Sequence, residues 1–166
     1  MKRLLVSLLL FALIFSFVSC GDKKQTEAEK HSAGEEFTVE NWKVKLGSVE
    51  FSQSVSIGNN LNQTAEEGKK FAVVRMELTN TGDEKDFFTG LVEMDGEFVI
   101  RLIAGNNEYK PTLTMNKNED LYSRQIEPNE TASGFMAFVV TQEDADAGSP
   151  VFRIDTGSAV YEVALG

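Results

Sequence analysis

Cysteine is almost absent from this sequence, and its scarcity excludes several ways of stabilising a fold. The single cysteine, Cys20, cannot form a disulfide within the chain, and one thiol cannot build a zinc or iron–sulfur site of the usual multi-cysteine type. Stability must therefore come from an apolar core. Residues 37–166 are long enough for one domain to bury such a core.

Histidine is equally scarce, which argues against nucleophilic catalysis. The one histidine, His31, lies in a polar segment that we expect to be a mobile tether, and a mobile imidazole is not held beside a nucleophile. A pair of carboxylates hydrolyses glycosides without histidine, but the acidic residues are scattered, mostly at turns and on outward strand positions. We therefore expect no catalytic residues, no cofactor and no enzymatic activity, with a hydrolase as the third-ranked alternative.

Basic residues are outnumbered by acidic ones, 16 to 26, which gives a formal net charge of −10. Nucleic-acid binding needs a basic face that neutralises phosphates. The longest basic run in residues 37–166 is Lys69-Lys70. We therefore expect no nucleic-acid partner, and we attribute most of the acidity to solubility.

Long apolar runs are also missing, except for Leu4–Val18, which follows Lys2 and Arg3. This run is shorter than the roughly 20 residues that span a bilayer as a helix, and it lacks the polar face of a core helix. A positive start, an apolar centre and a small residue before Cys20 are instead typical of a secretory signal. We predict a signal peptide over residues 1–19.

The end of this run, Phe17-Val18-Ser19-Cys20, resembles the lipobox of bacterial lipoproteins. The resemblance implies cleavage before Cys20 and attachment of diacylglycerol to its thiol, with acylation of the new amino group. The expected partner is therefore the membrane, through an N-terminal lipid anchor outside the cytoplasm. Because Gly21 stands where an inner-membrane retention signal has Asp, we expect the outer membrane if the cell has two, and otherwise the outer face of the cell membrane.

Residues 20–36 follow as a lipidated cysteine and a predicted disordered tether. The stretch contains no Phe, Tyr or Trp and no aliphatic residue larger than alanine, so it cannot bury a core of its own.

From Phe37 the pattern changes to short runs in which apolar and polar residues alternate, which is typical of strands with one wet face. Trp42, Val44 and Leu46 share one phase, so we expect Trp42 to be buried. Turn-forming pairs such as Asp95-Gly96 recur every 8 to 12 residues or so. At most one helical turn is expected, in residues 62–70. The expected strands are 42–46, 49–57, 72–79, 98–103, 131–141, 151–155 and 159–165, with short ones near Phe87 and Tyr122.

Several segments resemble a family of bacterial extracellular domains that are immunoglobulin-like, are common on lipoproteins and are related to a secreted mycobacterial immunoprotective antigen. The segments are 71–82, Tyr109-Lys110-Pro111, 126–131 and 134–138. The resemblance implies an all-β, immunoglobulin-like antiparallel β-sandwich over residues 37–166. That family is a domain of unknown function, so the resemblance implies no catalytic or binding residues.

Two acidic segments have some features of cation sites, and neither is predicted to hold a metal. Residues 116–127 have part of the oxygen spacing of a calcium loop, but they lack its leading Asp and have Leu121 where the sharp turn needs glycine. The second segment, Glu143–Asp146, is better explained as a solvated loop.

We expect the domain to act by binding a protein, a peptide or a glycan. The loops with most unassigned polar residues are 58–68 and 105–120, and the second contains Tyr109, a possible partner-binding anchor if it is exposed. Tyr109 would have no such role if it only closed a hairpin against Pro111. The alternative function is a structural spacer or assembly factor without a specific ligand.

Overall fold

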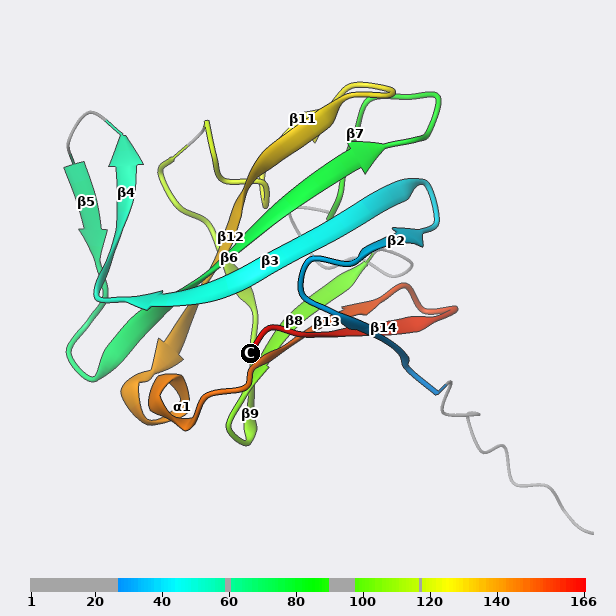
Figure 1. The fold of residues 1–166 in the computed structure, drawn as a ribbon. Coiled ribbons are helices and arrows are strands. Elements are labelled where there is room, and N and C mark those ends of the chain that lie inside the picture. The colour runs from blue at the N-terminus through cyan, green and yellow to red at the C-terminus, as the bar shows by residue number, and fades with distance from the viewer. Residues whose placement is uncertain (1–26, 59–60, 90–97, 117) are drawn as a thin grey trace, which may run out of the picture.

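Two five-stranded sheets form the body of the protein, and the computed structural model describes residues 27–58, 61–89, 98–116 and 118–166. Figure 1 shows the two sheets as stacked layers. Sheet I has the order β1 (Glu29–Ser32), β14 (Val160–Ala164), β13 (Val151–Asp155), β8 (Val99–Ala104) and β9 (Asn107–Tyr109). Sheet II has the order β10 (Pro111–Thr112), β12 (Thr131–Thr141), β6 (Lys69–Asn80), β3 (Trp42–Ser52) and β2 (Glu36–Val39).

Three smaller elements complete the described fold. The hairpin of β4 (Ser54–Gly58) and β5 (Leu61–Thr64) leaves sheet II after β3, and β7 (Asp86–Phe87) pairs with β11 (Gln125–Ile126). One short helix, α1 (Gln142–Ala147), follows β12. Within both large sheets the strands pair antiparallel except β1 with β14. The expected all-β sandwich is confirmed.

The core lies between the inner faces of the two sheets, where the alternating residues of the sequence meet. Phe138 of sheet II and Phe152 of sheet I pack edge to face with ring centroids 5.9 Å apart. Trp42 is only 3 % exposed and packs edge to face against Phe88, which confirms its predicted inward phase. The domain therefore builds its core from apolar side chains of distant strands.

Both margins of the sandwich are closed by chain segments that pass from one sheet to the other. At one margin β1 belongs to sheet I and β2 to sheet II, with a turn in which the Gly34 N–H donates to the Leu46 carbonyl. At the other margin Tyr109 ends β9 in sheet I and Pro111 begins β10 in sheet II. The edge strands are consequently short, which limits strand pairing between molecules.

The predicted tether, residues 20–36, extends too far into the chain. Strand β1 lies within it, pairs in parallel with β14 from Glu29–Tyr161 to Ser32–Ala164, and thereby joins the domain. The amino-acid composition gives no sign of this strand, because β1 pairs through backbone N–H and C=O groups and these are present in any sequence. Residues 1–26, including the predicted signal peptide and Cys20, lie outside the described residues.

The expectation that His31 lies on a mobile tether is also wrong. Its ring stacks on Phe37 with centroids 4.1 Å apart, and its side chain is 8 % exposed. Its Nδ1 lies 3.0 Å from Glu35 Oε1, and its Nε2 lies 3.1 Å from Glu29 Oε1. The contact with His31 lowers the pKa of Glu35 from its ordinary value, with the Ser32 N–H as the second cause. The histidine therefore fastens β1 to the sandwich.

Helix α1 replaces the solvated acidic loop that the sequence predicts over residues 143–146. Thr141 caps the helix, and its hydroxyl accepts a hydrogen bond from the Asp144 N–H. Threonine followed three residues later by an acidic residue is close to a capping box, so the sequence did contain a signal. The helical turn expected within 62–70 is absent from those residues, since 61–64 form β5. The predicted Asp95-Gly96 turn lies outside the described residues.

Candidate functional site

The outer face of sheet II is apolar at one end and polar at the other. At the apolar end, outward side chains of β6 and β12 are buried beneath the β4–β5 hairpin and form a second apolar cluster. The members of this cluster are Val55, Phe71, Val73, Phe135 and Ala137. At the polar end the face is open, and outward residues such as Arg75, Glu77 and Ser133 are exposed. The hairpin thus covers one part of the sheet face and leaves the other part free.

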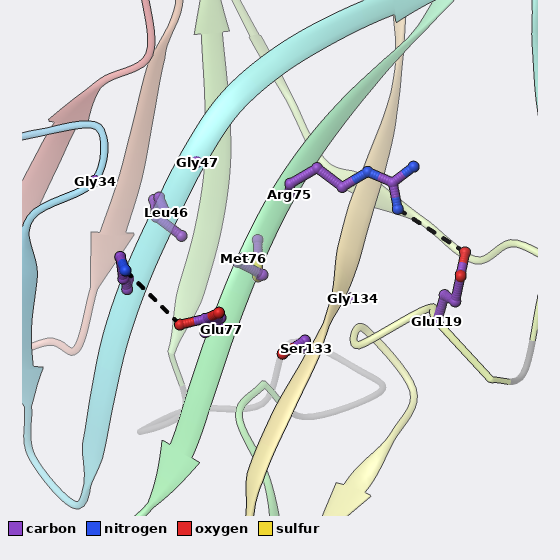
Figure 2. Close-up of a pocket in the computed structure, with 10 residues that line it drawn as sticks. Gly34, Leu46, Gly47, Arg75, Met76, Glu77, Glu119, Ser133 and Gly134 are labelled. Atoms are coloured by element: carbon purple, nitrogen blue, oxygen red, sulfur yellow. Dashed lines mark ion pairs between the residues drawn. The ribbon is translucent and has the colours of Figure 1, made fainter.

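A groove of about 370 Å³ lies on the open part of this face. We call it the sheet-face groove, and Figure 2 shows its lining. Its lining residues come from β3, β6 and β12, with additions from the turn before β2 and from the loop before β11. They are Gly34, Lys45, Leu46, Gly47, Arg75, Met76, Glu77, Glu119, Ser133 and Gly134. The volume lies within the range of small-ligand sites, roughly 300–1,000 Å³.

Gly47 leaves bare backbone in the lining of this groove, where another residue would place a side chain. A Cβ at position 47 would lie 3.3 Å from the Arg75 carbonyl oxygen and would press on the strand beside it. Gly47 lies at the irregularity between Leu46 and Val49, where the register of β3 against β6 shifts. The groove floor is therefore mostly main chain and the aliphatic parts of neighbouring side chains.

Four charged side chains surround the groove in two loose pairs. Lys45 Nζ lies 3.9 Å from Glu77 Oε2, and Arg75 Nη1 lies 3.9 Å from Glu119 Oε2. Figure 2 marks both pairs, with Arg75 and Glu119 on one side of the groove and Glu77 on the other. Each of these side chains is about half exposed, between 46 % and 56 %. Exposed pairs at this distance contribute little to stability, typically about 0–1 kcal/mol, so the charges remain available to a ligand.

A smaller hollow of about 140 Å³ adjoins the groove, because Arg75 and Glu119 line both. Its other walls include Ser52 at the end of β3 and Ser54 and Ser56 of the hairpin. The predicted recognition loop 105–120 therefore does border the site, through Glu119. The predicted loop 58–68 contributes no lining residue among those described.

The loop that supplies Glu119 is held by a buried aspartate. Asp120 is 1 % exposed, and its Oδ2 accepts hydrogen bonds from the N–H and the hydroxyl of Thr114, both at 2.7 Å. Its Oδ1 accepts the N–H of Tyr122 at 2.9 Å. These contacts occupy the carboxylate that a calcium loop over 116–127 would have needed as a ligand. Across the part of the chain that the structure describes, no group of three or more His, Cys, Asp or Glu residues is arranged to hold a metal.

Tyr109 lies away from the groove, at the margin where the chain changes sheet. Its ring is partly buried against the core, and its hydroxyl donates to Asp144 Oδ2 at the start of α1. Hydrogen bonds from Tyr109 and then from Asn107 lower the pKa of Asp144 from its ordinary value. The geometry fastens α1 to sheet I, and Tyr109 does not face Pro111 across a hairpin, because β9 and β10 belong to different sheets. A role of Tyr109 in binding stays a prediction.

Sequence reasoning missed Arg75, Lys45 and Glu77 as candidate site residues. Each stands on the outward phase of an expected strand, where solvation explains a charge. The available signal was the pair of unbroken apolar runs, 71–74 and 135–140, which indicate strands covered on both faces. Such runs indicate that another segment packs on the outer face of the sheet. A groove can form where that segment ends.

Among the described residues, no helix has the length and the apolar character needed to cross a membrane.

Several bacterial proteins of solved structure have the same fold. An uncharacterized β-sandwich protein from Clostridium difficile 630 superimposes with a TM-score of 0.64 at 14 % identity, over 88 % of this chain and 99 % of that one. The yjhA protein from Bacillus subtilis superimposes with a TM-score of 0.53 at 13 % identity, over 82 % of this chain and 99 % of that one. A conserved hypothetical protein from Bacillus anthracis superimposes with a TM-score of 0.55 at 16 % identity, over 82 % of this chain and 95 % of that one. At these identities the likeness concerns the fold.

No curated protein matches the chain. One family model does match, and it covers residues 18–147, which is more than half of the sequence. The chain therefore belongs to the family described as a domain of unknown function, DUF5067.

Proposed function

We propose that this protein is a lipid-anchored protein of the cell envelope whose β-sandwich binds a partner in the sheet-face groove and performs no catalysis. The observation that carries the binding role is the open groove with its two loose ion pairs at 3.9 Å, beside the part of the sheet face that the β4–β5 hairpin covers. A groove of this size with available charges is suited to a ligand. The proposal includes kinship with immunoglobulin-like immunoprotective extracellular domains, on the segments given above.

The absence of catalysis is part of the proposal and is supported by the chemistry at the groove. Its titratable side chains are the two cations and two carboxylates already named, and each carboxylate lies beside a cation. The single histidine faces Glu29 and Glu35, and it does not line the groove.

Photo-crosslinking in living cells tests the binding role. We would place p-benzoylphenylalanine at Lys43, which is exposed on β3 two residues before Lys45, and, as a control, at Ser158 in the turn between β13 and β14. The expected result is a specific adduct from position 43 and none from position 158. Adducts at equal levels from both positions, or from neither, would contradict a recognition site in the groove and would favour the alternative of a tethered spacer.

The anchoring role is tested by Cys20→Ser. Since the proposed lipid is attached to the thiol, the variant should lose lipid modification and should either appear in the soluble fraction or accumulate as an uncut precursor. The measurement is fractionation of cells, with mass determination of the N-terminal peptide. Ser19→Ala serves as a control, because it changes the residue before Cys20 but keeps a small side chain at the cleavage site. A correctly cleaved Cys20→Ser protein that stays on the membrane would contradict the anchor.

A further inference from the structure

Arg75 lies on the open sheet face, at its border with the β4–β5 hairpin, and its guanidinium lies beside an aromatic ring. It stands on β6, the central strand of sheet II, opposite Phe135 of β12 in the register. The guanidinium carbon lies 5.4 Å from the centroid of the Phe135 ring, at the distance of a cation–π contact. A guanidinium held by a ring is partly preorganised, so a ligand that it binds meets a smaller entropic cost.

The hydrogen-bond donors of this guanidinium are unused within the described residues. Its neighbour Glu119 is 3.9 Å away, which is beyond hydrogen-bond distance, and the same Glu119 oxygen accepts from Asn116 Nδ2 at 3.3 Å. The other described arginines differ in this respect. Arg124 donates to Glu130 at 2.8 Å, Arg153 donates to Glu162 at 2.7 Å, and Arg101 donates to the Ile100 carbonyl at 2.7 Å.

An exposed guanidinium with free donors is suited to a carboxylate, which it binds through two parallel hydrogen bonds. Glu77 carries a charge opposite to that of Arg75 and lies two residues further along β6, on the same face. Successive side chains on one face of a strand are about 7 Å apart. An extended peptide has the same spacing between residues i and i+2, so an acidic and a basic side chain at those positions match Arg75 and Glu77 at once.

The lining of the groove favours a peptide over a sugar. Sugars are commonly bound on the face of an exposed aromatic ring, whereas none of the described residues that line the groove is aromatic. The nearby Phe135 is 2 % exposed, so no ring face is left for a ligand. Glycine backbone and the stems of Lys45 and Arg75 instead offer a surface against which a peptide chain can lie.

We propose that the sheet-face groove receives an extended peptide segment of a partner protein, with an acidic side chain on Arg75 and a basic side chain two residues away on Glu77. This inference rests on the proposed binding function and names the class of partner. Ser133 is opposite Glu77 in the register of β12 and β6, and its hydroxyl makes no hydrogen bond within the described residues, so it is available to the peptide backbone.

The test uses synthetic peptides of known charge spacing. The probe is acetyl-Thr-Glu-Thr-Lys-Thr-Glu-Thr-Lys-Thr-amide, which alternates acid and base at every second residue. An isomer of the same composition, acetyl-Thr-Glu-Glu-Thr-Thr-Thr-Lys-Lys-Thr-amide, never places an acid and a base two residues apart. Binding is followed by NMR, through the Arg75 Nε–H and the backbone amides of Gly47 and Gly134. We expect the first peptide to bind at least tenfold more tightly than its isomer.

Two variants locate the contact. Arg75→Gln should weaken binding of the alternating peptide at least tenfold, whereas Arg153→Gln, which removes the same charge from the outer face of sheet I, should change it less than twofold. A peptide with Gln in place of both Glu residues cannot form the contact between a carboxylate and Arg75. It should therefore bind the unaltered protein and the Arg75→Gln variant with equal affinity. Trp42 fluorescence in urea checks that every variant is folded.

Equal binding of the two peptides, or unchanged binding by Arg75→Gln, would overturn the inference. So would binding of an oligogalacturonate in preference to the peptide, which would identify a glycan carboxylate as the ligand, or self-association through the groove in sedimentation. If the peptides fail while position 43 still gives a specific adduct in cells, the groove binds a partner of another class. If both fail, the proposed function fails as well.

Discussion

Replacing Gly134 with alanine is expected to destabilise the domain by about 3 kcal/mol, at the upper end of the usual cost of overpacking. A Cβ at position 134 would lie 2.1 Å from the Glu119 carbonyl oxygen and 2.9 Å from Leu121 Cγ. The first contact is with backbone, which has no alternative rotamer. The segment 119–121 would therefore have to move away from β12, and the hydrogen bond from the Phe135 N–H to the Glu119 carbonyl, 2.8 Å long, would be lost.

Urea unfolding monitored by the fluorescence of Trp42 measures this effect, because Trp42 is the only tryptophan and is buried. Ser133→Ala is the matched control. It changes the adjacent residue of the same strand, but that side chain points to solvent, so its effect should stay within about 0.5 kcal/mol. A Gly134→Ala protein as stable as the Ser133→Ala control would mean that the segment 119–121 does not pack against β12 as described.

Asp120→Ala is expected to lower the free energy of unfolding by a similar amount, about 3 kcal/mol, for a different reason. The buried carboxylate accepts three hydrogen bonds, two from Thr114 and one from Tyr122. Removing it leaves the two Thr114 donors buried without an acceptor and the Tyr122 N–H partly buried without one, and each buried donor costs about 1–3 kcal/mol unless water reaches it. The loop between β10 and β11 should loosen, and Glu119 at the groove should become mobile with it.

The measurement is again the midpoint of urea unfolding, together with hydrogen exchange of the Thr114 and Tyr122 amides. Asp83→Ala is the control, since Asp83 is an exposed aspartate in the turn after β6. We expect the control to unfold at nearly the unaltered midpoint. Protection of the Thr114 amide that survives in Asp120→Ala would rule out the buried carboxylate as the group that holds this loop.

Two strands, β12 and β13, were predicted with their observed bounds, residues 131–141 and 151–155. In β13, buried and partly exposed residues alternate because only one face is buried, whereas the apolar run 135–140 of β12 reflects cover on both faces.

Errors arose where contacts with distant parts of the chain decide the structure. The run 49–57 was predicted as one strand although Gln53 breaks its apolar phase, and the chain leaves sheet II after Ser52 and turns back over its outer face as the β4–β5 hairpin. Strand β1 has no apolar pattern at all and is held by parallel pairing with β14 at the far end of the sequence. The pairing of β1 leaves no local periodicity that identifies it, whereas the polar residues 52–54 mark the place where the other strand ends.

The sequence by itself determined the class of this protein: an all-β domain with Trp42 inside, since period-two alternation and burial follow from the geometry of a strand. It also determined the prediction of a lipid site at Cys20. Only the tertiary structure decided the candidate site. Lys45, Arg75 and Ser133 lie on three strands and become neighbours through sheet register, and the groove exists because the hairpin covers one end of that face and not the other. These distances depend on pairing between remote backbones, which residue pattern does not encode.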